Sequence, residues 1–157
     1  MKTFAKLRRL SAADGRLLFE ATLLLVLARV AIRVLPFRTI ARFASRLVIG
    51  VAPADAAVPA VVERVRWAVT VGARHGPGRA VCFPQGIAAQ TMLARRGVRG
   101  TLNYGIAKTA NGGIEAHVWV RAGDLPVVGC AQAARFNLMT CFPPKDRPVP
   151  ELTESAP

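Results

Sequence analysis

The hydrophobic pattern of this chain changes its period near Thr101, and that change restricts the folds open to it. Before Thr101, apolar residues recur at spacings of three and four, which lines one face of an α-helix. From Thr101 onward, apolar and polar residues alternate, as they do along a half-buried β-strand. Helices followed by strands therefore indicate an α+β fold, with helices packed on a small antiparallel sheet.

Four stretches before Thr101 combine a helical apolar face with a Pro or Gly near the end. They cover residues 17–35, 39–48, 58–74 and 82–96. The last of them has Cys82 at its start and Gly97 just past its end. Pro84 supplies a preset φ for its first turn, so we expect Cys82 to lie at the helix N-terminus.

Three strands are predicted after Thr101, and they cover residues 101–107, 114–121 and 125–128. A polar turn with Asn111, Gly112 and Gly113 separates the first two, and Ala122-Gly123 separates the second from the third. The three strands should therefore form an antiparallel meander.

Length and composition indicate one domain with three segments. At 157 residues the chain is long enough to bury a core without disulfides. We expect an arginine-rich and leucine-rich helical segment at 1–50, a core at 51–142 that begins with a Pro-containing linker, and a Pro-rich tail at 143–157 that cannot form a sheet ladder.

The net charge of +13 admits an acidic partner, an anionic membrane surface or nucleic acid. Arginines are dispersed and aromatic residues make up only 6% of the chain, so nucleic-acid binding is not expected. The three cysteines are odd in number and irregularly spaced, which favours a reducing, cytoplasmic location.

The leucine-rich stretch 17–35 is not expected to span a membrane. Glu20, Arg29 and Arg33 interrupt it, and its longest uncharged run, 21–28, is far shorter than the roughly 20 residues that a bilayer requires. We interpret it as a core or partner helix, with membrane contact at most peripheral. Asp14 and Glu20 also argue against a signal peptide.

Cys82 is the candidate nucleophile. The unpaired N–H groups and the dipole of a helix N-terminus favour negative charge, and they can lower a thiol pKa from about 8.5 into the range of roughly 3.5 to 7.5. The alternative is a structural cysteine in the apolar run 80–83. The histidine on a later strand favours the nucleophile.

His117 is the candidate general base. It lies on the second predicted strand, and Trp119 projects from the same face, where it can wall the imidazole from water. The alternative is a core histidine with a satisfied hydrogen bond. His75, the only other histidine, follows a helix in a Gly-Pro turn and is expected to be solvated.

The third catalytic residue is less well defined by the sequence. Asp124 is the acid that follows His117, and in a triad it would orient the imidazole. Strand geometry opposes this role, since a turn at Gly123 leaves Asp124 about 13 Å from His117. The position facing His117 falls near Val128 or Gly129, where the chain has no acid. Asp124 stays the best single candidate, and ordinary turn chemistry is its alternative role.

The sequence offers few other candidates for catalytic or binding residues. The backbone N–H of Cys82 could donate to an oxyanion, and no second donor is assigned. Gln85 and Gln90 are interpreted as surface or packing residues, and Glu115 as a weak substitute acid. No metal spacing, phosphate loop or dinucleotide motif is present, so neither a metal nor a cofactor is expected.

Two segments, Cys82-Phe83-Pro84-Gln85-Gly86 and Glu115-Ala116-His117-Val118-Trp119-Val120, resemble those of lasso peptide maturation proteases. Residues 93–98 and 35–38 are also similar, and the resemblance covers most of residues 16–142. These proteases are transglutaminase-like cysteine peptidases, here in the split form that lacks a fused leader-recognition domain.

The resemblance implies a papain- or transglutaminase-like core at 51–142 that removes the leader from a ribosomally made precursor. It implies Cys82 and His117 as catalytic residues, with an Asp on the strand after the histidine. It also implies a precursor leader peptide, a separate leader-recognition protein and an ATP-dependent macrolactam cyclase as partners.

Two alternatives remain open from the residues. A transglutaminase-like acyltransferase would form the same acyl-enzyme and pass it to an amine instead of water. A non-catalytic basic adaptor would bind an acidic peptide or a membrane surface, would not need Cys82, and would weaken steeply with salt.

Overall fold

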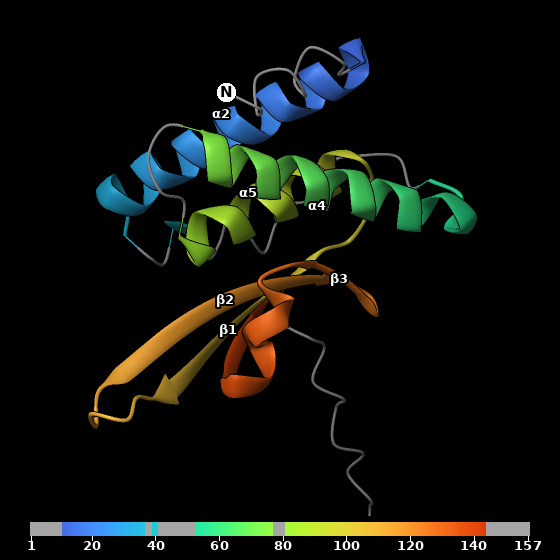
Figure 1. The fold of residues 1–157 in the computed structure, drawn as a ribbon. Coiled ribbons are helices and arrows are strands. Elements are labelled where there is room, and N and C mark those ends of the chain that lie inside the picture. The colour runs from blue at the N-terminus through green and yellow to red at the C-terminus, as the bar shows by residue number, and fades with distance from the viewer. Residues whose placement is uncertain (1–10, 37–38, 41–52, 77–80, 144–157) are drawn as a thin grey trace, which may run out of the picture.

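Three helices lie on one side of a four-stranded sheet in a computed structural model that describes residues 11–36, 39–40, 53–76 and 81–143 (Figure 1). The helices are α2 (Ala12–Val34), α4 (Val58–His75) and α5 (Cys82–Arg95). Helices α4 and α5 pack on the sheet, and α2 packs on both of them. The α+β fold expected from the change of period is confirmed.

Helix α2 starts five residues before the apolar pattern that predicts it. Ser11 caps its N-terminus by accepting a hydrogen bond from the Asp14 amide at 3.1 Å, and Pro36 follows its end. The buried face contains Leu17, Ala21, Leu25 and Ala28. A polar capping residue thus extends the helix beyond the apolar stripe that locates it.

Glu20 fixes α2 against the end of α5. Its carboxylate lies 2.6 Å from Nη2 of Arg96 and 3.4 Å from Nε of Arg95. Asp14 similarly pairs with Arg64 of α4 at 2.9 Å. Both acids of α2 therefore face the body of the protein.

Helix α5 is the centre of the core and carries Cys82 at its first position. Its residues from Gly86 to Ala94 are all buried between the other helices and the sheet. It ends as predicted, because Gly97 adopts a φ of 70° and the amides of Gly97 and Val98 bind the carbonyls of Ala94 and Leu93. This cap turns the chain directly into the sheet.

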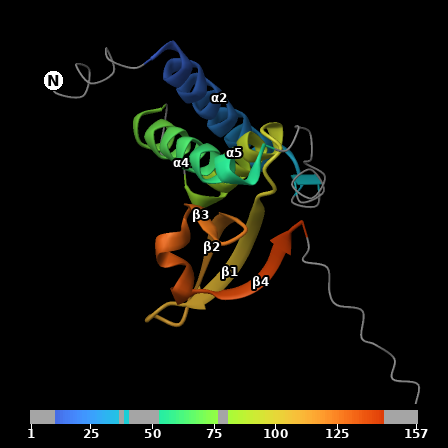
Figure 2. The same cartoon turned by 90° about the vertical axis from the view of Figure 1, so that its right-hand side faces the viewer.

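The sheet contains the three predicted strands in the expected antiparallel meander, as β1 (Thr101–Lys108), β2 (Ile114–Ala122) and β3 (Leu125–Val128). A fourth strand, β4 (Asn137–Phe142), pairs with the free edge of β1, and Figure 2 shows the resulting order β3-β2-β1-β4. The sequence did not predict β4. It is exposed along most of its length, so it lacks the alternation of buried and exposed residues that marks a half-buried strand.

Gln90 connects α5 to two separate strands. Its Nε2 donates to the carbonyl of Gly100 at 3.1 Å and to that of Phe142 at 2.7 Å, and the residue is only 2% exposed. Gln90 is therefore a packing residue, one of the two roles expected for it. It holds the start of β1 and the end of β4 against the central helix.

Several expectations concern segments that lie partly or wholly outside the described residues. Of the predicted helix at 39–48, all but the first two residues lie outside the described part, as does the predicted tail from 144 onward. Within the predicted linker, Asp55–Ala57 form a short 3₁₀ turn that leads into α4. No helix in the described part of the chain is both long and apolar enough to cross a membrane.

Candidate active site

Cys82 occupies the first turn of α5, as expected. Val81 precedes it in an extended conformation with no side-chain cap, and Gln85 donates its amide to the Val81 carbonyl at 3.4 Å. The Cys82 amide comes before that first helical hydrogen bond, so it belongs to the donors that a helix leaves unpaired at its N-terminus. The thiol is half-buried and not in a disulfide.

His117 lies on β2, opposite Gly105 of β1, and its ring is fixed on several sides. Its Nε2 lies 2.8 Å from the carbonyl oxygen of Gly129. Phe136 stacks on the ring with a centroid distance of 4.9 Å, and Trp119 stacks at 6.1 Å. Two aromatic rings thus stack on the imidazole, and one of them is the Trp119 expected from the strand pattern.

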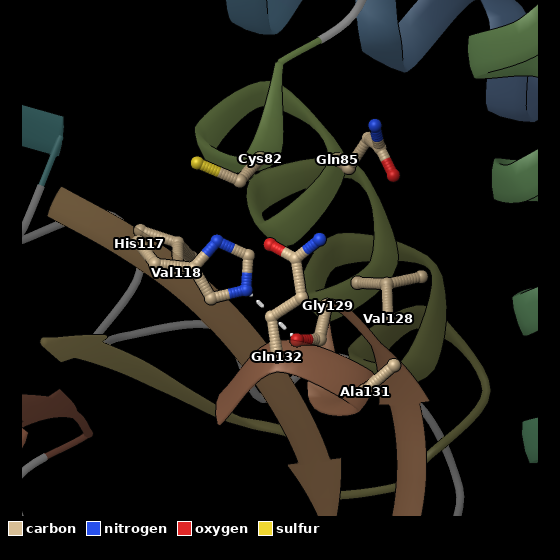
Figure 3. Close-up of a pocket in the computed structure, with 8 residues that line it drawn as sticks. All are labelled: Cys82, Gln85, His117, Val118, Val128, Gly129, Ala131 and Gln132. Carbon is tan, nitrogen blue, oxygen red and sulfur yellow. Dashed lines mark hydrogen bonds between the residues drawn. The ribbon is translucent and has the colours of Figure 1, made fainter. Parts of the chain in front are cut away.

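Cys82 and His117 line the same pocket, which has a volume of about 220 Å³. Figure 3 shows the Cys82 sulfur on one side and the imidazole below it, with the ring nitrogen that is not bound to Gly129 pointing toward the cysteine side. The other lining residues are uncharged, and they are Gln85, Val118, Val128, Gly129, Ala131 and Gln132.

The contact with Gly129 decides the tautomer of a neutral His117. A carbonyl oxygen can only accept a hydrogen bond, so Nε2 must carry the proton in this contact. Nδ1 is then the nitrogen with a free lone pair. It faces the side of the pocket on which the Cys82 thiol lies.

The structure does not bring Asp124 to His117. Asp124 sits in the β2–β3 turn beyond the pair Ala122 and Leu125, and its side chain is fully exposed. Its partner is Arg121, which donates to the Asp124 carbonyl at 2.6 Å and lies 4.0 Å from the carboxylate. Five residues of extended strand separate His117 from Ala122, a distance of roughly 16 Å.

Gly129 is one of the two residues expected to face His117, but the observed register places it beside Trp119. An irregularity between Val120 and Arg121 shifts the register of β3, so that Val128 pairs with Val120. The chain then turns at Gly129, and its carbonyl meets the imidazole. Glu115, the one acid within β2, pairs with Arg135 at 3.6 Å.

Two residues beside Cys82 and His117 were not predicted from the sequence. Gln132 projects from the 3₁₀ helix η2 (Cys130–Arg135) into the pocket, and Phe136 follows that helix. No periodic pattern marks a short 3₁₀ helix, so the sequence offers no signal for either side chain. Gln85, interpreted as a surface or packing residue, also lines the pocket. His75 ends α4, is exposed, and is absent from the pocket lining.

A family model described as the transglutaminase-like superfamily matches residues 22–141. The chain belongs to this superfamily. The match extends from α2 into β4 and includes both Cys82 and His117. Transglutaminase-like proteins are typically cysteine peptidases or acyltransferases, and the shared pocket of a thiol and an imidazole agrees with that chemistry. No curated protein and no solved structure matches the chain.

Proposed function

We propose that this transglutaminase-like protein is a cysteine peptidase that removes the leader from a ribosomally made lasso peptide precursor. The observation that carries the proposal is the shared pocket, in which Nδ1 of His117 faces the side occupied by the Cys82 thiol. The resemblance of residues 82–86 and 115–120 to lasso peptide maturation proteases supplies the substrate class.

Hydrolysis would proceed through an acyl-enzyme on Cys82. Nδ1 of His117 takes the thiol proton, and the thiolate attacks the carbonyl carbon of the scissile peptide bond. The Cys82 amide donates to the oxygen that becomes negative. His117 then protonates the leaving amine, which releases the core peptide with a free N-terminus.

The leader remains bound to the sulfur as a thioester. Water attacks that thioester while His117 accepts its proton, and the leader leaves with a free carboxylate. The free amine on the core peptide is the group that an ATP-dependent cyclase needs to close a macrolactam. We therefore place the protein before such a cyclase, in the cytoplasm.

Masses of the products test this proposal directly. The protein, its precursor and its leader-recognition partner are mixed in water enriched in ¹⁸O. Hydrolysis yields a leader whose carboxylate contains one ¹⁸O atom, together with a core peptide that has a free amine. An acyltransferase would instead yield a leader joined to an amine without ¹⁸O. Cleavage by a Cys82→Ala variant at the wild-type rate would rule out Cys82 as the nucleophile of either enzyme. Leader binding without any cleavage by the wild-type protein would favour the non-catalytic adaptor.

The outer face of α2 supports docking of the separate leader-recognition protein. Phe19, Leu23, Leu27, Val30 and Val34 are all exposed along this one helix face. Contiguous exposed apolar surface of this kind is typical of interaction sites. Both acids of α2 pair with arginines outside it, and Arg16 and Arg33 are its exposed charges, so this helix favours a partner surface that is apolar at its centre and acidic at its rim.

A double substitution at two exposed positions of α2 tests the docking proposal. Phe19→Gln with Val34→Gln removes apolar side chains that are 71% and 72% exposed, so binding of the recognition protein should weaken while folding is retained. Ile114→Gln, at a site 75% exposed at the start of β2, is the matched control. Equal binding curves for the double variant and the Ile114→Gln control, titrated with the recognition protein, would exclude this face as the docking surface.

A further inference from the structure

The main chain just after β3 occupies the place next to His117 where a triad would have its acid. Gly129 contributes only its carbonyl oxygen, 2.8 Å from Nε2. Asp124 lies at the far end of the β2–β3 turn, and Glu115 is paired with Arg135. The residues that line the pocket in the described part of the chain include no carboxylate.

The conformation of Gly129 explains how its carbonyl reaches the ring. Its φ is +73°, a left-handed value that residues with a side chain rarely adopt. A Cβ added here would collide with the carbonyl oxygen of Val118 and would lie 3.1 Å from Cα of Trp119. The chain therefore passes directly against β2 at this point, and only glycine fits both the turn and the close approach.

We infer that the Gly129 carbonyl performs the orienting role of the missing acid, which makes the site a Cys82–His117 dyad with Gly129 as its positioning residue. The inference rests on the proposed use of His117 as the base for Cys82. The carbonyl keeps the proton on Nε2 throughout the cycle. Nδ1 alone takes the thiol proton and returns it to the leaving amine, so every proton that moves passes through one nitrogen.

A comparison of two glycine variants tests this role. Gly129→Ala should lower kcat for leader cleavage by about 10-fold or more, with little change in KM, because the imidazole loses its orientation. Gly123→Ala is the matched control, since Gly123 also has a positive φ, of 57°, but a Cβ there has no atom within 4 Å. Both variants carry backbone strain. Equal kcat values in two folded variants would overturn the inference.

If Gly129→Ala does not fold, the same contact can be tested by making the Gly129 carbonyl a weaker hydrogen-bond acceptor. Semisynthesis can replace the 129–130 peptide bond by an ester, with lactic acid at position 130 and Cys130→Ala as its all-amide control. An ester carbonyl is the poorer acceptor, so kcat should fall about 3- to 10-fold relative to the control, as expected for loss of one hydrogen bond. Unchanged kcat would show that the carbonyl has no positioning role.

Two measurements without substrate separate this inference from the peptidase proposal. Nitrogen-15 NMR of the resting protein should show neutral His117 protonated on Nε2, and Nδ1 protonation would overturn the inference. The rate at which iodoacetamide alkylates Cys82 should fall in Gly129→Ala and not in Gly123→Ala. Slower alkylation combined with an absence of leader cleavage in the wild-type protein would refute the peptidase proposal and leave the positioning role intact.

Discussion

Helix α5 and the segment after β3 each supply one half of the site, and they differ sharply in burial. α5, which carries Cys82, is buried continuously from Gly86 to Ala94. η2, which lies between Gly129 and Phe136, contains no buried residue. Cys82 is therefore positioned by the core packing of its helix, whereas the segment after β3 holds His117 through the Gly129 carbonyl and the Phe136 ring, and Trp119 of β2 stacks on it as well. Substitutions at the buried positions of α5 should change stability and activity together, whereas substitutions at the exposed positions of η2 should change activity alone.

The largest effect is expected for Cys82, which stands at the exposed end of the buried helix. Cys82→Ala should reduce leader cleavage by at least about 10³-fold, with an unchanged unfolding midpoint, because the half-buried thiol contributes chemistry more than packing. In the wild-type protein, iodoacetamide should label Cys82 before Cys130 and Cys141, as followed by peptide mass mapping. Equal labelling of all three thiols would contradict an activated nucleophile.

His117→Ala should lower kcat by about 10²-fold or more, because the reaction loses its proton acceptor. The matched control is Trp119→Phe, which retains an aromatic ring beside position 117. Steady-state cleavage assays of both variants give the comparison. A His117→Ala variant that cleaves at the wild-type rate would remove the imidazole from the mechanism.

Gly86→Ala tests the coupling of stability and activity in α5. The added Cβ would lie 2.7 Å from Cγ1 of Val118 and 3.2 Å from Cδ1 of Leu102, so the helix must move away from the sheet. We expect the free energy of unfolding to fall by about 1 to 3 kcal/mol and kcat to fall about 10-fold. Chemical denaturation and cleavage assays measure the two effects.

The control for Gly86→Ala is Gly15→Ala in α2, where a Cβ has no atom within 4 Å. That substitution should raise the free energy of unfolding by about 0.5 to 1 kcal/mol and leave cleavage unchanged. If Gly86→Ala lost activity without losing stability, the proposed contrast between the buried and exposed halves of the site would fail.

The smallest effect is expected for Asp124. Asp124→Ala should keep kcat within about twofold of the wild-type value, since its fully exposed carboxylate faces Arg121 and not the imidazole. A loss as large as that of His117→Ala would instead mean that the β2–β3 turn rearranges when substrate binds.

The sequence predicts those parts of the site that periodic patterns determine. The helix start at Cys82 and the strand position of His117 follow from Pro84, Gly97 and the alternation after Thr101. The absence of an acid opposite His117 also follows from strand register. The contribution of Gly129 does not, because every residue has a main-chain carbonyl and the sequence does not show which carbonyl contacts a side chain.

Surface elements are the other part that the sequence leaves undetermined. β4 and η2 are both exposed, so no apolar face specifies where they lie. Phe136 reaches His117 only through the turn that η2 makes. Contacts that depend on a short exposed connection are set by tertiary structure, which local pattern does not encode.

The contact between Gly129 and His117 also bears on how comparable sites could be found in other chains. A search pattern that demands an acid at the strand position facing the histidine would pass over this protein. A pattern with a cysteine opening a buried helix, a histidine on the second strand of a meander and a glycine twelve residues later would retain it. Sequences that meet the second pattern and fail the first would form a set in which a main-chain oxygen, and not a side chain, could complete the site.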